Sequence, residues 1–303
     1  MTISVCMIVK NEEKVLARCL DSLKTIADEI VIADTGSTDR TKEIAAQYTD
    51  KIYDFEWIGD FSAARNFVFS KATGDYIYSA DADEVLDLGN IKRFQVLKKC
   101  MIPEVEIVTM IYVNPKDINM AYNNLRERRP KLFKRLRTFT WIDPIHETVR
   151  LDPVVFDSDV EILHCPEENH SRRDFDAFLK VLAEQGDMSD RLWSMYAKEL
   201  FFNGNAEDFK TAAPFFEKRM DGGETFESLE AVCVVTRTML ETGDFGRVEE
   251  FAAQYDTFEE RPAELGYILG QIFERMGNGE RAEHYYDLSS QDESFIKSDY
   301  RRL

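Results

Sequence analysis

Three carboxylates stand together at the end of an apolar segment in the sequence DYIYSADADEVL. Asp81, Asp83 and Glu84 follow a run of residues, 75–81, that is typical of a buried strand. Negative charges gathered at the end of a strand raise the electrostatic energy unless something positive lies beside them. The positive charge could come from a lysine or arginine elsewhere in the chain, from bulk solvent, or from a bound metal ion.

A divalent metal is the interpretation that we favour for this acidic segment. Asp81 and Asp83 are two residues apart, so in an extended chain their side chains point to the same side. Carboxylate oxygens suit Mg²⁺ or Mn²⁺, and such an ion usually keeps positions open for substrate phosphates. We therefore expect an ion that bridges a diphosphate. The alternative is a solvated acidic turn that caps a helix over 84–89.

The residues before this segment, which must position it, alternate between strand and helix patterns. Apolar runs typical of buried strands are separated by segments with apolar residues at helical spacing. Strands are expected at 3–9, 29–34, 51–57 and 75–81, and helices at 11–26, 37–48 and 62–72. This alternation predicts an α/β domain whose sheet is mostly parallel, with helices on both faces.

Polar residues follow the first two of these strands as well. Val9, Asn11 and Glu12 lie at the end of the first strand, and Asp34 and Ser37 lie at the end of the second. Ligands of open parallel sheets bind at the carboxyl ends of the strands, so we expect a binding site there. The sequence has no G-x-G-x-x-G and no G-x-x-x-x-G-K-[ST], which counts against a dinucleotide fold and a P-loop NTPase.

The segment from about 105 to 165 has a different pattern, with strand-like runs and few helical ones. The runs are 105–113, 130–136, 138–142 and 159–164. They could extend the sheet in mixed orientation or form a small antiparallel flap. Residues 126–137 include seven basic residues. Arg128, Arg129 or Lys131 could face a diphosphate, or the run could be an amphipathic strand whose charges face water.

The rest of the chain is expected to be almost entirely helical. Three helix-ending phrases, around Gly204, Gly243 and Gly277, resemble one another at separations of 39 and 34 residues. This period is typical of tetratricopeptide-type helix pairs, and an irregular helical bundle is the alternative. We therefore predict two domains, at 1–166 and 167–303.

Composition limits the possible partners and the location. The chain of 303 residues has a formal net charge of -19, which disfavours a nucleic-acid partner. It shows no N-terminal targeting signal and no apolar run long enough for an integral membrane segment. Five dispersed cysteines are typical of reduced thiols in a cytoplasmic protein.

Three ordered motifs resemble the nucleotide-sugar half of family 2 glycosyltransferases, which have the Rossmann-like GT-A fold. The motifs are SVCMIVKNEEKVLARCLDSL, EIVIADTGSTDRTKEIA and DFSAARNFVFSKATGDYIYSADADEVL. The resemblance is strong over residues 3 to 90 and looser over 126 to 165. Together with the helical C-terminal region, the chain resembles the tetratricopeptide-associated subgroup, which includes peptide S-glycosyltransferases of the SunS type.

The resemblance implies a role for each matching residue. The turn from Val9 through Asn11 to Glu12 would line the uridine pocket together with Asp34. Asp34 would accept a hydrogen bond from uracil N3–H, Glu12 would lie near the ribose, and Ser37 would lie close by. The alternative for Asp34 and Ser37 is a turn and a helix cap.

The remaining implied residues surround the diphosphate and the metal. Arg65 would reach the base or the diphosphate, and the alternative is a surface ion pair. Asp81 would touch the ribose or the metal, Asp83 would bind the metal directly, and Ala82 between them would line the donor site. From the basic run, and not from the resemblance, we choose Arg129 as the residue that would stabilise the leaving diphosphate.

A third metal ligand and a catalytic base complete the expected site. His164, at the end of a strand, resembles the place where some members of the fold supply a histidine to the metal; the alternative is a structural histidine. Inverting transfer needs a base to deprotonate the acceptor. The Glu-Asp pair that many members use is missing here. His146 and Glu147 are the first candidates and Asp143 is the second, although His146 and Glu147 could instead make only a structural contact.

The sequence therefore predicts a metal-dependent inverting glycosyltransferase that uses Mn²⁺ or Mg²⁺. It would move a sugar from a UDP-sugar to a peptide, protein or glycan acceptor. The helical region would dock the acceptor or form a homo-oligomer. No Q-x-x-R-W pattern and no membrane helices follow, which counts against a processive polysaccharide synthase.

Two other functions stay open at this point. The chain could be a non-catalytic scaffold with a degenerate GT-A domain, in which case UDP would show no metal-dependent binding. It could also be a nucleotidyltransferase, which would release pyrophosphate instead of UDP. That class should have a Gly-rich basic loop after the first strand, and VKNEEK is not such a loop.

Overall fold

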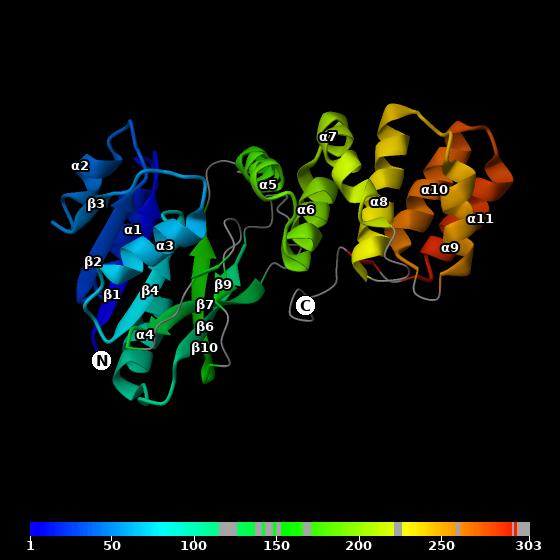
Figure 1. The fold of residues 1–303 in the computed structure, drawn as a ribbon. Coiled ribbons are helices and arrows are strands. Elements are labelled where there is room, and N and C mark those ends of the chain that lie inside the picture. The colour runs from blue at the N-terminus through cyan, green and yellow to red at the C-terminus, as the bar shows by residue number, and fades with distance from the viewer. Residues whose placement is uncertain are drawn as a thin grey trace. The chain divides into compact units, whose positions relative to one another are not determined.

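The computed structural model of the chain consists of two units (Figure 1). It describes residues 1–114, 126–136, 141–142, 148–149, 153–165, 171–220, 226–258, 261–292 and 294–295. Contacts between Cα atoms assign the described residues up to 165 to an α/β unit and those from 171 onward to a helical unit. The expected domain boundary, between 166 and 167, lies outside the described residues.

The α/β unit alternates strands and helices as the sequence predicts. Its strands are β1 Ile3–Val9, β2 Glu29–Asp34, β3 Ile52–Asp54, β4 Tyr76–Ala80, β5 Glu84–Val85, β6 Ile107–Val113, β7 Arg126–Lys134, β8 Trp141–Ile142, β9 Thr148–Val149 and β10 Val155–His164. Its helices are α1 Leu16–Leu23, α2 Thr41–Ala45, α3 Phe61–Ser70 and α4 Leu88–Cys100. The predicted bounds of β1 and β2 are confirmed to the residue.

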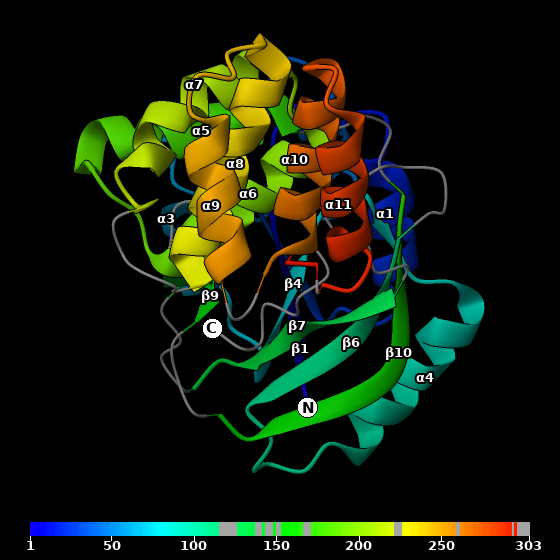
Figure 2. The ribbon, with the colours of Figure 1, turned by 90° about the vertical axis from the view of Figure 1, so that its right-hand side faces the viewer.

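Eight of the strands form one sheet, in the order β3-β2-β1-β4-β7-β6-β10-β5. The first four are parallel to one another, whereas β7 is antiparallel to both β4 and β6. Strands β6 and β10 are parallel (Figure 2). Three of the four strand-like runs after residue 105 therefore extend the sheet in mixed orientation, whereas the run over 138–142 contributes β8 to a small antiparallel pair, so each of the two arrangements left open occurs in part. Strands β8 and β9 form a separate two-stranded antiparallel sheet.

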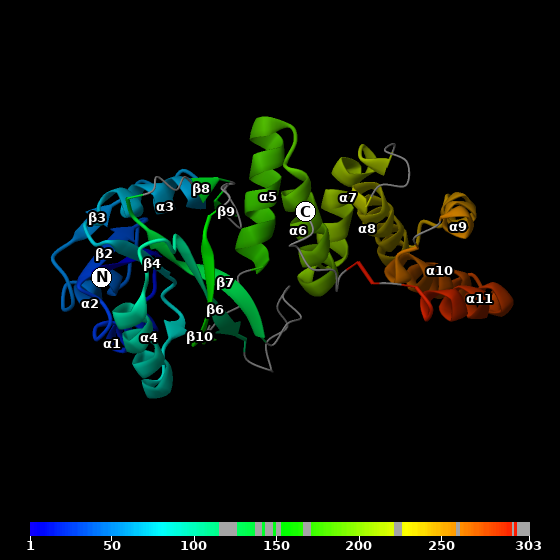
Figure 3. The ribbon, with the colours of Figure 1, turned by 90° about the horizontal axis from the view of Figure 1, so that it is seen from below.

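Alternating residues of the central strands face two separate hydrophobic clusters. Ile3, Val5 and Met7 of β1 pack in the larger cluster with side chains of α1 and α4, while Cys6 packs in the smaller cluster with Val68 of α3. Figure 3 shows α3 on one side of the strands and α1 and α4 on the other. Strands β1, β2 and β4 are buried on both faces, which explains why these parallel strands are continuous apolar runs.

Helix α4 was expected only as the alternative helix over 84–89, and it instead spans Leu88–Cys100. It begins after Asp87, whose carboxylate caps the helix by accepting a hydrogen bond from the backbone N–H of Asn90 at 2.7 Å. Only Asn90 and Phe94 of this helix are buried, so its apolar periodicity is weak. The predicted strand over 75–81 is also shorter, because β4 ends at Ala80 and leaves Asp81 outside the strand.

The helical unit contains the helices that the sequence predicts after residue 170. They are α5 Ser171–Gln185, α6 Asp190–Asn203, α7 Ala206–Glu217, α8 Phe226–Thr242, α9 Val248–Thr257, α10 Ala263–Arg275 and α11 Gly279–Ser289. Gly243 and Gly277 follow two of them with φ of 73° and 76°, the left-handed conformation that favours glycine after a helix. Helix α7 packs against α8, and α10 against α11. Whether these pairs are tetratricopeptide-like stays a prediction.

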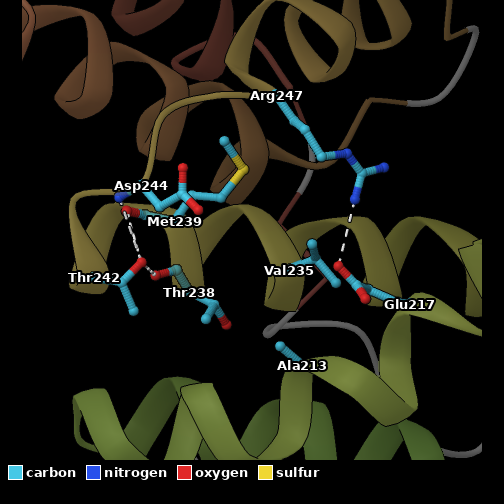
Figure 4. A pocket seen from close by; sticks show the side chains of 8 residues that line it. All are labelled: Ala213, Glu217, Val235, Thr238, Met239, Thr242, Asp244 and Arg247. Atoms are coloured by element: carbon cyan, nitrogen blue, oxygen red, sulfur yellow. Dashed lines mark hydrogen bonds and ion pairs between the residues drawn. The ribbon is translucent and has the colours of Figure 1, made fainter.

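A small hollow of about 160 Å³ lies within the helical unit, among α7, α8 and the turn before α9. Figure 4 shows its lining, which includes the ion pair of Arg247 and Glu217, whose atoms are 3.3 Å apart. None of the residues that line it belongs to the predicted site. Within the described ranges, no helix has the length and apolar character that crossing a membrane requires.

Candidate active site

The carboxyl ends of β1, β2 and β4 lie side by side at one edge of the sheet. Val9, the last residue of β1, pairs with Asp34, the last residue of β2. On the other side of β1, Met7 pairs with Ala80, the last residue of β4. The polar segments that follow these three strands therefore begin next to one another, as the sequence predicts.

The turn after β1 is joined to the turn after β2 by hydrogen bonds. The backbone N–H of Asn11 donates to Ser37 Oγ at 2.9 Å, and Asn11 Oδ1 accepts from the backbone N–H of Thr38 at 2.8 Å. The N–H of Glu12 donates to Thr41 Oγ1 at 2.7 Å. Asn11 has φ of 56°, a conformation that asparagine adopts more readily than most residues. The two turns thus form one connected wall at the strand ends.

Asp34 is buried at the base of this wall. Its Oδ1 accepts hydrogen bonds from the backbone N–H groups of Gly36 and Ser37, at 3.0 and 2.9 Å. Its Oδ2 is also buried, and it has no hydrogen-bond partner among the residues that the structure describes. Because a buried carboxylate oxygen without a partner is energetically costly, this atom is a candidate acceptor for a ligand N–H.

Arg65 reaches the end of β4 from helix α3. The carboxylate of Asp60 caps α3, accepting from the backbone N–H of Ala63 at 3.0 Å. From this helix the buried guanidinium of Arg65 donates to Ser79 Oγ at 2.6 Å and lies 3.7 Å from Asp81 Oδ1. The alternative of a surface ion pair for Arg65 is therefore wrong.

Lys131 of β7 contacts two of the three carboxylates that follow β4. Its Nζ lies 2.6 Å from Glu84 Oε1 and 3.5 Å from Asp81 Oδ2. Burial raises the pKa of Glu84, and Lys131 opposes this effect. Burial also raises the pKa of Asp81, but the charges of Lys131 and Arg65 outweigh it and hold that pKa below its ordinary value. Lys131 and Arg65 therefore balance much of the negative charge of the acidic segment after β4.

The third carboxylate, Asp83, contacts the predicted metal ligand His164. Asp83 Oδ2 lies 3.0 Å from His164 Nε2, and Asn114 Oδ1 lies 3.1 Å from His164 Nδ1. Antiparallel pairing of β5 with β10 places His164 opposite Glu84, which brings the histidine beside the acidic segment. The structure thus brings together two residues that are 81 positions apart in the sequence.

Comparison with known proteins assigns this unit to a family. Residues 4–149 match the model of glycosyl transferase family 2. The α/β unit belongs to this family. Because these residues contain the three strand ends, the candidate site lies in the part of the chain that the match covers, apart from His164.

Several curated relatives share this glycosyltransferase domain. A TPR repeat-containing protein of Synechococcus elongatus is 37% identical over 149 residues, which are 48% of this chain and 35% of the relative. An uncharacterized glycosyltransferase of Rickettsia felis is 27% identical over 172 residues, covering 52% and 56%. The glycosyltransferase SunS of Bacillus subtilis is 40% identical over 91 residues, covering 29% and 22%. The chain spans about half or less of the length of these relatives.

Solved structures with a similar arrangement include two from bacteria. TarS 1-349 of S. aureus in complex with UDP-GlcNAc has a TM-score of 0.43 at 12% identity, covering 96% of this chain and 92% of that one. Glucosyl-3-phosphoglycerate synthase of Mycobacterium tuberculosis with Mn²⁺ and UDP-glucose has a TM-score of 0.42 at 12% identity, covering 62% and 81%.

The donor atoms of the glycosyltransferase domain fit a divalent metal at one place. Asp83 and His164 are in contact and partly exposed, with 19% and 12% of their side-chain surface accessible. Asp81 contacts Arg65 and Lys131 instead, so the two aspartates have different partners. Within the described ranges, no three His, Cys, Asp or Glu side chains form a ready metal site. The carboxylate of Asp83 suits Mn²⁺ or Mg²⁺, which take other ligands from phosphates and water, and the imidazole of His164 suits the transition metal Mn²⁺ better than Mg²⁺.

The other predicted residues take different places in the domain. Val9 and Ala82 are buried, so they shape the site through packing and backbone. The guanidinium of Arg129 lies 3.8 Å from the centre of the Tyr112 ring and 2.5 Å from Glu127. Its neighbour Arg128 donates to the carbonyl of Ser158 at 2.8 Å. Of the three basic residues that were considered, Lys131 contacts Asp81 and Glu84 of the acidic segment directly.

Two residues at the site were not assigned a role there by sequence reasoning, Asn114 and Ser79. Asn114 follows β6 directly, and a search of every predicted strand end for amides would have found it. The candidate bases Asp143, His146 and Glu147 lie outside the described residues, as does most of the polar loop 114–124.

Proposed function

We propose that this chain transfers a sugar from a UDP-sugar to an acceptor by a metal-dependent, inverting displacement. The observation that carries the proposal is the buried Oδ2 of Asp34, which has no hydrogen-bond partner in the described part of the chain, on the same sheet edge as the Asp83–His164 pair. The first offers an acceptor for the N3–H of uracil, and the second offers ligands for a metal. A nucleoside diphosphate presents both of these groups.

The residues of the chain would divide the work of binding the donor. The joined turns after β1 and β2, which contain Val9, Asn11, Glu12 and Ser37, would enclose the uridine. Asp34 would select uracil by accepting a hydrogen bond from its N3–H. Hydrogen bonds between the turns hold this wall in place before the ligand arrives.

Asp83 and His164 would hold Mn²⁺ or Mg²⁺. When bound, this ion supplies positive charge that stabilises the departing diphosphate. Asp81, with Ala82 behind it, would orient the ribose side of the donor, and Arg65 would keep Asp81 in place. Arg129 would add positive charge near the diphosphate. The acceptor would be a peptide, protein or glycan.

The helical unit would dock the acceptor or mediate self-association, because stacked helix pairs offer extended surfaces. A base among His146, Glu147 and Asp143 would deprotonate the acceptor. The cytoplasmic location expected from the dispersed cysteines stays a prediction.

The test is a screen of UDP-sugars for hydrolysis in the presence of Mn²⁺. We expect the parent protein to release UDP from at least one of them and Asp83→Ala to do so at least about 100-fold more slowly, because a metal contributes several kcal/mol to charge stabilisation. Asp50→Ala, which changes an exposed aspartate elsewhere in the same unit, is the matched control. Hydrolysis by Asp83→Ala at the parent rate would show that the metal assignment is wrong.

The same assay separates the two other functions. Release of pyrophosphate instead of UDP would identify a nucleotidyltransferase. Calorimetry that finds no metal-dependent binding of UDP would favour a scaffold. Either result would overturn the proposed transfer.

A further inference from the structure

Lys131 is a buried cation beside the candidate site, and the proposed function assigns it no role. The residue is 5% exposed, and its Nζ lies between Glu84 Oε1, at 2.6 Å, and Asp81 Oδ2, at 3.5 Å. Lys131 belongs to β7, Glu84 to β5, and Asp81 directly follows β4. Two strands and the segment that follows β4 thus contribute one ionisable side chain each to a series of contacts.

The three side chains differ in their access to a ligand. Only 6% of the Lys131 side chain and 1% of the Glu84 side chain are accessible, compared with 43% for Asp81. A buried ammonium needs a partner close by to remain charged, and Glu84 provides it. Asp81 is therefore the member of the group that can meet a ligand, and Lys131 lies behind it.

Each oxygen of Asp81 has its own cation. Oδ1 lies 3.7 Å from Arg65, and Oδ2 lies 3.5 Å from Lys131. Arg65 is itself fixed by Ser79, and Lys131 by Glu84. A carboxylate that is contacted at both oxygens is restrained in rotation, so less freedom is lost when it binds a ligand.

We propose that Lys131, held by Glu84, is a positioning residue that fixes the Asp81 carboxylate for binding of the nucleoside diphosphate. This inference rests on the proposed function. Lys131 acts through Asp81 and does not touch the donor. Without Lys131, one oxygen of Asp81 loses its partner and faces the carboxyl group of Glu84. The competing explanation is that Lys131 and Glu84 only stabilise the fold.

A neutral double variant, Glu84→Gln with Lys131→Met, separates these explanations. Removing one member of a buried ion pair leaves an uncompensated charge, whereas removing both is often tolerated. We expect the double variant to unfold thermally near the parent temperature but to bind UDP in the presence of Mn²⁺ about tenfold more weakly by calorimetry, the size of one lost charge contact. Lys134→Met, on the same strand, removes a lysine that contacts the carbonyl of Pro103 and should bind like the parent.

The energetic coupling between the double variant and Asp81→Asn distinguishes a positioning role from a purely structural one, because a purely structural role predicts no coupling in UDP affinity. Asp81→Asn should weaken UDP binding when it is made in the parent. In the double variant the same substitution should cause a much smaller further loss of UDP affinity, because Asp81 is already displaced in that protein. Fully additive losses would overturn the inference. If the double variant does not fold, Lys131→Gln, whose amide can still donate to Glu84, is measured in the same cycle with the same expectation.

The outcomes distinguish this inference from the function on which it rests. If the parent binds UDP with Mn²⁺ and the stable double variant binds it equally well, Lys131 is not a positioning residue and the proposed function stands. If the parent binds no UDP at all, both are overturned.

Discussion

At the scale of single residues, the aspartates of the site differ in what they contact. Asp34 accepts from two backbone N–H groups, Asp81 lies between two cations, and Asp83 lies against an imidazole. These surroundings assign them different tasks in the proposed enzyme, namely base selection, orientation and metal binding. Substitutions at the three positions should therefore change different properties.

Asp34→Asn should change which nucleobase the site prefers. Two backbone N–H groups donate to the position of Oδ1, which only an acceptor can fill. The asparagine must therefore put its carbonyl oxygen there and its NH₂ at the buried position of Oδ2. That NH₂ would meet the N3–H of uracil, donor against donor. We expect UDP to bind about 10- to 100-fold more weakly, in line with the loss of a charged hydrogen bond.

Cytidine diphosphate is the matched ligand for this variant, because N3 of cytosine is an acceptor. Calorimetry with both nucleotides should show that the ratio of their affinities moves toward CDP in Asp34→Asn. Equal weakening of UDP and CDP would contradict a contact between Asp34 and the base.

Asn114→Leu should weaken the metal site without removing a metal ligand. Asn114 Oδ1 accepts from His164 Nδ1, which leaves Nε2 directed at Asp83. Loss of such an orienting partner typically costs 10- to 100-fold in metal affinity, and we expect a loss in about this range. A Mn²⁺ titration in the presence of UDP, followed by electron paramagnetic resonance of the free ion, measures it.

Thr109→Val is a suitable control for this titration, since Thr109 lies on the same strand β6 and its hydroxyl contacts Asp157. Parent-like Mn²⁺ affinity in Asn114→Leu would mean that His164 needs no orientation by Asn114, or that it does not bind the metal.

At the scale of elements, strand order decides which residues meet. Strand β7 enters between β4 and β6, so Lys131 reaches the end of β4 from a segment about 50 residues later in the chain. Strand β10 runs parallel to β6, so its last residue, His164, lies at the edge of the sheet where β4 ends. At the opposite edge, Glu29 at the start of β2 contacts Ser4 of β1, Lys51 just before β3 and Thr73 in the turn before β4.

The Glu29 cluster predicts a pH-dependent part of the stability. Burial raises the pKa of Glu29, but hydrogen bonds from Lys51, Ser4 and Thr73 outweigh it and lower the pKa to about 2. Because the folded pKa is lower than the unfolded one, this stabilisation is present above about pH 4.5 and is lost as the pH falls toward 2. Glu29→Gln should therefore lower the free energy of unfolding at pH 7 by about 2 kcal/mol.

Urea unfolding of the parent and Glu29→Gln at a series of pH values checks this. The difference between the two proteins should shrink as the pH falls from 5 to 3. Glu43→Gln, which changes an exposed glutamate paired with Arg40, should match the parent throughout. A difference that does not change with pH would mean that Glu29 acts through packing instead of charge.

At the scale of the whole molecule, the described donor-site residues all lie in the α/β unit. That unit has its own hydrophobic clusters, and the helical unit has separate buried residues on α5 to α11. Domains with their own cores can in principle fold alone. Donor binding should then be a property of the α/β unit.

A fragment of residues 1–170 tests this division. We expect it to bind UDP in the presence of Mn²⁺ within about threefold of the full chain, a difference below 1 kcal/mol. Calorimetry on both proteins, with circular dichroism to verify that the fragment is folded, is the measurement. A loss of more than about tenfold would show that the helical unit contributes to the donor site.

The sequence alone determined the features that depend on neighbouring residues. The bounds of β1 and β2, the series of helices after residue 170 and the polar strand ends followed from local periodicity and from capping residues, because these reflect the conformation of short segments. The motifs from Val9 to Glu12, Asp34 to Ser37 and Asp81 to Asp83 also indicated the family, which the family match then showed.

The tertiary structure decided which charges meet. It placed Lys131 against Glu84 and Asp81, and His164 against Asp83, although these residues are 47 to 81 positions apart. Such contacts depend on strand order and register, which local patterns do not encode. The spacing of Asp81 and Asp83 suggested a shared metal, but β4 ends before Asp81, and the two side chains take different partners.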